Sequence, residues 1–277
     1  MIVSVFYTRS LWRNLFAHVI EPFIILNQRD IKYWCIYFSS TQGEHISLAV
    51  MAADDAVIEK RFLKIAENFL TLNPSEKGII EFPLKDFFKD YPNNSIQFNK
   101  SKSLTHSWNN SNQMPQQQAI SIALVEAFKN EVIDNESIYS FLIYMQFGII
   151  HSVYPDIRHA CSVIPNILIA AQKSSVIPDK IADDELNSLI KLFENNKEIF
   201  PGIIKDVWEE DRISDLDWLY DLEISFRKFV KANFSAEFIS LSTLLCKHLG
   251  LNEKMAGLSS QLIIKTFKQL PQLVKRS

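Results

Sequence analysis

His45 is the first residue whose surroundings suggest acid–base chemistry. It follows Gly43 and Glu44 at the start of a stretch with the composition of a β-strand. Since imidazole titrates near neutral pH, a histidine at this place could act as a general acid or base. A surface or purely structural role is the alternative, and the sequence leaves both open.

Two further histidines come directly after a cationic residue. Arg158 precedes His159 at the start of an apolar helical stretch, and this pair could hold a carboxylate. Lys247 precedes His248 near the end of another helical stretch, where cations interact favourably with the helix dipole. Solvated helix ends would explain both pairs as well, so a functional and a structural interpretation remain for each.

Several kinds of site are missing from the sequence. The 6 histidines never form H-x-x-x-H or H-E-x-x-H, and the 3 cysteines include no C-x-x-C pair. Neither a metal site nor a disulfide framework is therefore expected. Only 6 of the 277 residues are glycine, and neither G-x-G-x-x-G nor G-x-x-x-x-G-K-[ST] occurs. Nucleotide cradles of these two kinds are excluded, and no cofactor is expected.

The charge and hydropathy of the chain also exclude some classes of partner and location. The chain has 29 Lys and Arg against 32 Asp and Glu, a net charge of −3, which offers no positive field for nucleic acid. The N-terminus has no basic region followed by a long apolar core, so no signal peptide is expected. The apolar residues 19–26 are interrupted by Glu21 and Pro22 and are too few to cross a bilayer. We expect a cytoplasmic protein without a membrane span.

In the N-terminal part of the chain, stretches with the apolar pattern of a strand alternate with stretches that have the apolar pattern of a helix. Runs of β-branched and aromatic residues predict three strands, over Ile2–Thr8, Lys32–Ser39 and His45–Ala52. A short turn that contains Gly43 should join the last two strands as a hairpin. Helical periodicity predicts a helix over Leu11–Asn27, bent or ended early by Pro22, and a second helix capped by Asp54 or Asp55. This order is typical of a split β-α-β layer, with helices on one face of an antiparallel or mixed sheet.

The character of the chain changes after this layer. Residues 79–84 could form another strand, and residues 85–118 form a long polar stretch, either a loop over a site or a partly disordered insertion. Seven helices are predicted after it, over Ala119–Lys129, Glu136–Ser152, Arg158–Lys173, Asp184–Asn195, Ser214–Ala232, Ser235–Leu249 and Met255–Leu270. We expect an α+β fold with a mostly helical C-terminal half. It should form a single unit of residues 1–277, with a sheet-rich part (1–84), a polar loop (85–118) and a helical part (119–277).

Three regions of the chain carry a family pattern. The first predicted helix contains I-E-P-F over residues 20–23, and the hairpin reads W-C-I-Y-F-S over 34–39 and G-E-H-I-S-L-A over 43–49. The C-terminal part contains L-S-T-L-L-C-K-H-L-G over 241–250. In order and spacing these resemble the motifs apolar-x-P-F, W-F-F-I-R-Y, G-P-H-L-R-L-R and L-H-M-x-x-N-R-L-x-G of the thiopeptide-type bacteriocin biosynthesis family. The family includes the C-terminal glutamate-elimination domain of lantibiotic dehydratases, and this chain resembles a stand-alone, divergent member.

The resemblance implies the maturation of a ribosomally synthesised peptide of the lanthipeptide or thiopeptide type. In the dehydratases, a separate domain glutamylates Ser or Thr, and the elimination domain removes the α-proton and expels glutamate to leave a dehydroamino acid. Elimination on a modified Ser or Thr, a lyase reaction, is the main expectation. One alternative is a formal [4+2] cycloaddition of two dehydroalanines that forms a pyridine ring. The other is a non-catalytic partner that binds the peptide or another modifying enzyme.

The matched motifs also nominate a site. We expect it between the hairpin at Gly43 and the end of the helix near His248, under the polar loop 85–118. The candidate catalytic residues are His45, Lys247 and His248. The candidate substrate contacts are Gly43, Glu44, Ser47, Arg158, His159 and Ser242. Ser47 and Ala49 stand where the family has arginines, and Ser242 stands where it has a histidine. The bidentate grip of arginine on a glutamyl carboxylate is therefore missing at these positions.

The resemblance further implies the partners, which are a precursor peptide with leader and core and a separate glutamylating dehydratase subunit. The sequence leaves the oligomeric state open, a homodimer included. Two function classes outside this pathway stay open as well. One is a binding module that uses the acidic stretch Trp208–Glu223 to hold a basic peptide. The other is a small-molecule enzyme whose pocket lies away from His45.

Overall fold

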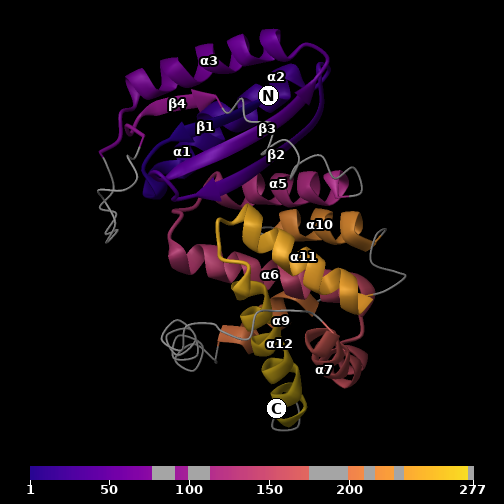
Figure 1. Ribbon diagram of the computed structural model, residues 1–277. Coiled ribbons are helices and arrows are strands. Elements are labelled where there is room, and N and C mark those ends of the chain that lie inside the picture. The colour runs from indigo at the N-terminus through magenta and orange to yellow at the C-terminus, as the bar shows by residue number, and fades with distance from the viewer. Residues whose placement is uncertain (77–90, 99–112, 175–198, 209–215, 228–233, 274–277) are drawn as a thin grey trace. The chain divides into compact units, whose positions relative to one another are not determined.

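The computed structural model describes residues 1–76, 91–98, 113–174, 199–208, 216–227 and 234–273. In these residues the chain is α+β, with a four-stranded antiparallel sheet near the N-terminus and mostly helices after it, as the sequence predicts (Figure 1). The chain divides into two compact units. Unit 1 comprises Met1–Tyr139 and His248–Gly250, and unit 2 comprises Ser140–Lys247 and Leu251–Ser277. The strand expected over 79–84 and the helix expected over 184–195 lie outside the described residues.

The sheet of unit 1 has the order β2-β3-β1-β4. Its strands are β1 (Ile2–Phe6), β2 (Ile31–Ser39), β3 (His45–Ala52) and β4 (Ser95–Phe98). The first three match the predicted strands, and the β2–β3 hairpin turns through Gln42 and Gly43, both with positive φ. β4 was not predicted, because its four residues lie within the polar stretch and are too few to show a period of two.

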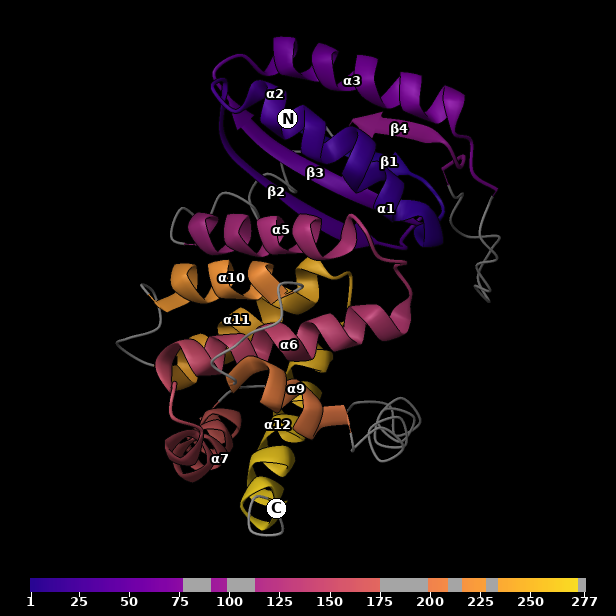
Figure 2. The same cartoon turned by 180° about the vertical axis from the view of Figure 1, so that it is seen from behind.

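Helices cover one face of this sheet (Figure 2). They are the 3-10 turn η1 (Arg9–Leu11), α1 (Trp12–Leu15), the π-helical turn η2 (Phe16–Ile20), α2 (Glu21–Asn27) and α3 (Asp55–Leu72). The rings of Trp12 and Phe16 lie 4.9 and 6.0 Å from the ring of Phe38 on β2, and Phe23 of α2 meets Phe62 of α3 edge to face at 5.0 Å. This aromatic contact between the helices and the sheet is the core of unit 1.

Of two local sequence features at these helices, the cap at Asp54 is as predicted and the effect of Pro22 is not. Asp54 caps α3, since its carboxylate accepts the backbone N–H groups of Ala56 and Val57 at 3.0 and 3.1 Å, as the sequence predicts. Pro22 does not end the first helix. Proline has no N–H to donate, and the turn before it widens into the π-helical segment Phe16–Ile20, from which α2 continues to Asn27.

The free edge of β2 is covered by side chains from two distant parts of the sequence. Helix α5 (Met114–Phe128) runs beside β2, and the Ile36 N–H donates to the Ser121 hydroxyl at 3.0 Å. The Ile36 carbonyl accepts a hydrogen bond from Nδ1 of His248 at 2.7 Å. An uncovered edge would offer these groups to another chain. Residues 248–250 therefore pack on the edge strand β2 of unit 1, although they are distant from it in sequence.

Unit 2 is helical. Its helices are α6 (Asn135–Val153), which begins in unit 1, α7 (Ile157–Ser174), α9 (Ile199–Trp208), α10 (Asp217–Arg227), α11 (Phe234–His248) and α12 (Lys254–Leu273). The rings of Phe147, Trp208 and Phe267 lie between 5.7 and 6.2 Å apart and form part of its core. α9 was not among the helices that the sequence predicts. In the described part of the chain, no helix is both long and apolar enough to cross a membrane.

Candidate functional site

One row of uncharged polar side chains crosses the sheet on the face opposite α1 to α3. The strand register aligns Ser4 of β1 with Ser47 of β3 and Ser47 with Tyr37 of β2, so the three side chains share a face. The hydroxyl oxygens of Ser4 and Ser47 lie 2.8 Å apart. His45 stands two residues before Ser47 on the same strand and therefore on the same face. We call Ser4, Tyr37, His45 and Ser47 the sheet-face row.

His45 is held as a neutral imidazole with one defined tautomer. Its Nδ1 lies 2.9 Å from the Gly43 carbonyl oxygen, which can only accept, so Nδ1 carries the proton. Burial lowers the pKa of His45, which keeps the ring neutral at pH 7, although its hydrogen bond to Gly43 opposes this effect. The lone pair therefore lies on Nε2. An imidazole held in this way is prepared to accept a proton.

Gly43 and Glu44 fix the turn that orients His45. Gly43 has φ +115°, and a Cβ at this position would lie 3.2 Å from the ring of Phe6, so the turn requires glycine. The Glu44 carboxylate accepts the backbone N–H of Arg9 at 2.8 Å and lies 3.7 Å from the Arg9 guanidinium. Both residues were predicted as substrate contacts. In the structure each has a clear role in positioning the hairpin, and substrate contact stays a prediction.

Tyr37 connects the sheet-face row to the end of α11. Its ring stacks on the His248 imidazole, with centroids 4.2 Å apart and planes at 21°. Burial, with Cys35 nearby, raises the pKa of Tyr37, so its hydroxyl keeps its proton. His248 is fully buried, and its bond to the Ile36 carbonyl fixes the ring against β2. The structure therefore brings His45, Ser47 and His248 to one part of unit 1, where the ring of Tyr37 contacts His248, and a catalytic role for the two histidines stays a prediction.

The other predicted site residues belong to unit 2. Ser242 is 0% exposed and accepts a hydrogen bond from Nε2 of Gln146 at 2.9 Å, so it lies in the core of that unit. Arg158 and His159 are exposed in the first turn of α7, and Lys247 is half-buried at the end of α11. Ser242 therefore lies in the core and Arg158 and His159 lie on the surface, and substrate contact stays a prediction for all three residues.

A further histidine, His151, was not among the predicted site residues, and a carboxylate orients it. Nδ1 of His151 on α6 lies 3.0 Å from a Glu223 carboxylate oxygen on α10, and Glu223 is only 1% exposed. Gly148 allows the two helices to approach, since a Cβ there would lie 2.5 Å from Leu219. The spacing of Gly148 and His151 on one helix face, and of Leu219 and Glu223 on another, is the sequence signal for this contact. Among the described residues, no group of three His, Cys, Asp or Glu side chains could hold a metal ion.

Comparison with known proteins identifies the fold. No protein-family model matches the chain, and no curated protein sequence matches it. Among solved structures, the chain is similar to the pyridine synthase TbtD from thiomuracin biosynthesis. The TM-score is 0.57 at 12% sequence identity, and the match covers 96% of each chain. At this level of identity, the likeness shows a shared fold.

Proposed function

We propose that this protein matures a ribosomally synthesised peptide by joining two dehydroalanine residues into a pyridine ring. The fold shared with TbtD along almost the whole chain supports a role in peptide maturation. The observation that carries the choice of reaction is the sheet-face row, which offers a neutral base and neutral hydroxyls beside one another. The substrate would be a peptide that already contains dehydroalanines.

The chemistry of the ring closure suits such a row. One dehydroalanine amide must lose its N–H proton while its preceding carbonyl oxygen gains one, so that the nitrogen becomes part of a diene. Two carbon–carbon bonds to the second dehydroalanine then close the ring, and loss of water and of a peptide amide makes it aromatic. Nε2 of His45 would accept the amide proton and then deliver it to the carbonyl oxygen, to which Ser47 would donate a hydrogen bond. Holding the two alkenes together would provide most of the acceleration.

Glutamate elimination is the second candidate, and His45 is the observation that favours it. A base that could take an amide proton could also take the α-proton of a glutamylated serine. The glutamyl leaving group, however, carries carboxylate charge that elimination enzymes of this family must hold. The strand residues nearest His45 on this face are Phe6 and Ser39, which pair with it, and Tyr37 and Ser47 beyond them, and none of these four carries a positive charge. We therefore place ring formation before elimination.

Mass spectrometry distinguishes these reactions. The protein is incubated with a synthetic peptide that carries two dehydroalanines and, separately, with a glutamylated peptide. Ring formation predicts loss of water and of the N-terminal peptide segment from the first peptide, with new near-ultraviolet absorbance from the pyridine. Loss of glutamate from the second peptide, with the first unchanged, would replace the proposal by elimination. Two unchanged peptides would overturn an enzymatic role on these substrates.

His45→Gly provides the test of the base. We expect its rate to fall about 10²- to 10⁴-fold, the usual contribution of a general base, and added imidazole to restore part of it. Ser225→Ala on α10, a helix of unit 2, is the control for handling and folding, and it should keep the wild-type rate. A His45→Gly protein with the wild-type rate would refute the role given to this residue.

A further inference from the structure

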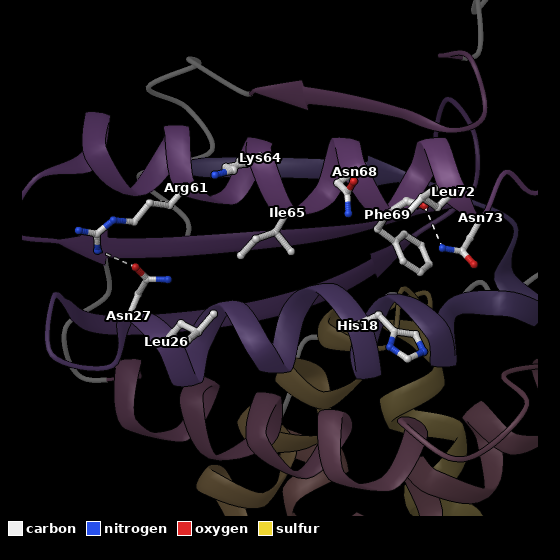
Figure 3. A pocket seen from close by; sticks show the side chains of 10 residues that line it. All are labelled: His18, Leu26, Asn27, Arg61, Lys64, Ile65, Asn68, Phe69, Leu72 and Asn73. Carbon is white, nitrogen blue, oxygen red and sulfur yellow. Dashed lines mark hydrogen bonds between the residues drawn. The ribbon is translucent and has the colours of Figure 1, made fainter.

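Unit 1 contains a groove between α2 and α3, distant in the fold from the sheet-face row because helices and row lie on opposite faces of the sheet. It has a volume of about 1080 Å³. One wall is a single face of α3, formed by Arg61, Lys64, Ile65, Asn68, Phe69 and Leu72 (Figure 3). The other wall comes from η2 and α2, with His18, Leu26 and Asn27. The stretch of α3 covers about three turns, or roughly 16 Å at 1.5 Å per residue.

Contacts between the two walls hold this groove in shape. At one end, Nη1 of Arg61 donates to the Asn27 side-chain oxygen and to Asp30, both at 2.7 Å. At the other end, the His18 ring stacks on Phe69, with centroids 6.1 Å apart. Between these two contacts, Ile65 lies in the middle of the groove (Figure 3). The groove is therefore formed before any ligand binds, which lowers the entropy cost of binding.

The polar lining favours an anionic ligand. It contains Arg61 and Lys64 and three asparagines, and no carboxylate belongs to it. Asp30 already meets the charge of Arg61 at 2.7 Å. Lys64 is exposed, and no carboxylate lies within ion-pair distance of it among the residues that the structure describes. Lys64 is therefore the main positive charge that a ligand would meet.

The apolar lining favours a peptide over a small anion. Leu26 is 73% exposed on α2 and Leu72 is 70% exposed on α3, the two highest values among the exposed large apolar residues of the described chain. They stand at opposite ends of the groove, with Lys64 and Asn68 between them (Figure 3). A small anion would leave both leucines in water. A helix with apolar residues at both ends of one face would cover them.

We infer that this groove binds an acidic, amphipathic helical segment of the peptide on which the protein acts. Carboxylates of the segment would pair with Lys64, and its apolar side chains would cover Leu26, Ile65 and Leu72. The identity of the peptide rests on the proposed function, whereas the groove and its chemistry do not. The groove would thus recognise a part of the substrate other than the part that reacts.

Fluorescence anisotropy with the full chain tests this inference. The probe is a labelled amphipathic peptide with leucines on one helical face, glutamates beside them and no dehydroalanine. We expect Lys64→Ala to weaken binding about two- to fivefold, the range of an exposed ion pair. Leu72→Ser should weaken it about tenfold through lost apolar contact, and its exposure means that the fold is not disturbed. Lys60→Ala, an exposed lysine of the same helix outside the groove, is the matched control and should bind like wild type.

A second peptide has glutamine in place of every glutamate. The wild type should bind it several-fold more weakly than the glutamate peptide, whereas Lys64→Ala should bind the two peptides with equal affinity. Equal affinity of both peptides for the wild type, or equal effects of Lys60→Ala and Lys64→Ala, would overturn the inference. This assay involves no reaction. A negative mass-spectrometric result together with specific binding would refute the proposed function and leave the groove assignment intact, and the opposite pair of results would refute the groove alone.

Discussion

Replacement of Gly250 by alanine tests whether residues 248–250 belong to the sheet of unit 1. Gly250 has φ +67°, and a Cβ there would lie 2.6 Å from the Phe38 carbonyl oxygen and 2.9 Å from its carbonyl carbon. A left-handed conformation costs alanine roughly 1 kcal/mol. The collision adds about 1–3 kcal/mol, because the atoms belong to the backbone of a paired strand and cannot turn aside as a side chain would.

We therefore expect Gly250→Ala to lose about 3 kcal/mol of stability. For a chain of this size this lowers the Tm by roughly 6–12 °C. Differential scanning calorimetry measures the shift. Gly202→Ala is the matched control, since Gly202 is exposed within α9 and a Cβ there meets no atom within 4 Å. It should be neutral or stabilise by up to about 1 kcal/mol. Equal Tm values for the two variants would refute the packing of residue 250 on β2.

Three further predictions concern the edge strand, His45 and the thiols. Ser121→Ala leaves the buried Ile36 N–H without its acceptor and should cost about 1–3 kcal/mol in urea unfolding. Ser225→Ala is the control, because the Ser225 hydroxyl donates to the Asp221 carbonyl within its own helix, and it should stay within about 0.5 kcal/mol of wild type. Because the fold lowers the pKa of His45, its contribution to the free energy of unfolding is complete above its unfolded pKa of about 6.5 and is lost as the pH falls below that value. Between about pH 7.5 and about pH 5.5, the free energy of unfolding should therefore fall less for His45→Gln than for the wild type. Burial raises the pKa of Cys246 to about 12, so a thiol reagent at about pH 8 should modify the native protein at the half-buried Cys161 first and reach Cys246 only on unfolding.

Local sequence signals were sufficient for most of unit 1. The strand over His45–Ala52 has the same bounds in sequence and structure, and Asp54 caps the helix after it. Apolar periodicity and capping act within a few residues, so a single sequence contains them. β4 was missed because four residues in a polar stretch become a strand only through pairing with β1. Pro22 was expected to bend or end its helix, and a widened turn absorbs the missing hydrogen bond instead.

The candidate site was predicted only in part, because its composition depends on register and on tertiary contacts. The family motif identified His45, and the structure adds the tautomer and the lowered pKa. Ser4 and Tyr37 join it through strand pairing across the sheet, which no local pattern reveals. The groove was missed for a related reason. Periodicity marks the face of α3 that contains Ile65 and Phe69 as a core face, and only the position of α2 shows that part of it stays open.

The most direct test of the proposed function is the mass of a peptide with two dehydroalanines after incubation with the wild-type protein. The account predicts a product that has lost water and its N-terminal segment and that absorbs as a pyridine, with formation slowed in His45→Gly. An unchanged peptide mass under conditions in which the protein is folded would contradict it.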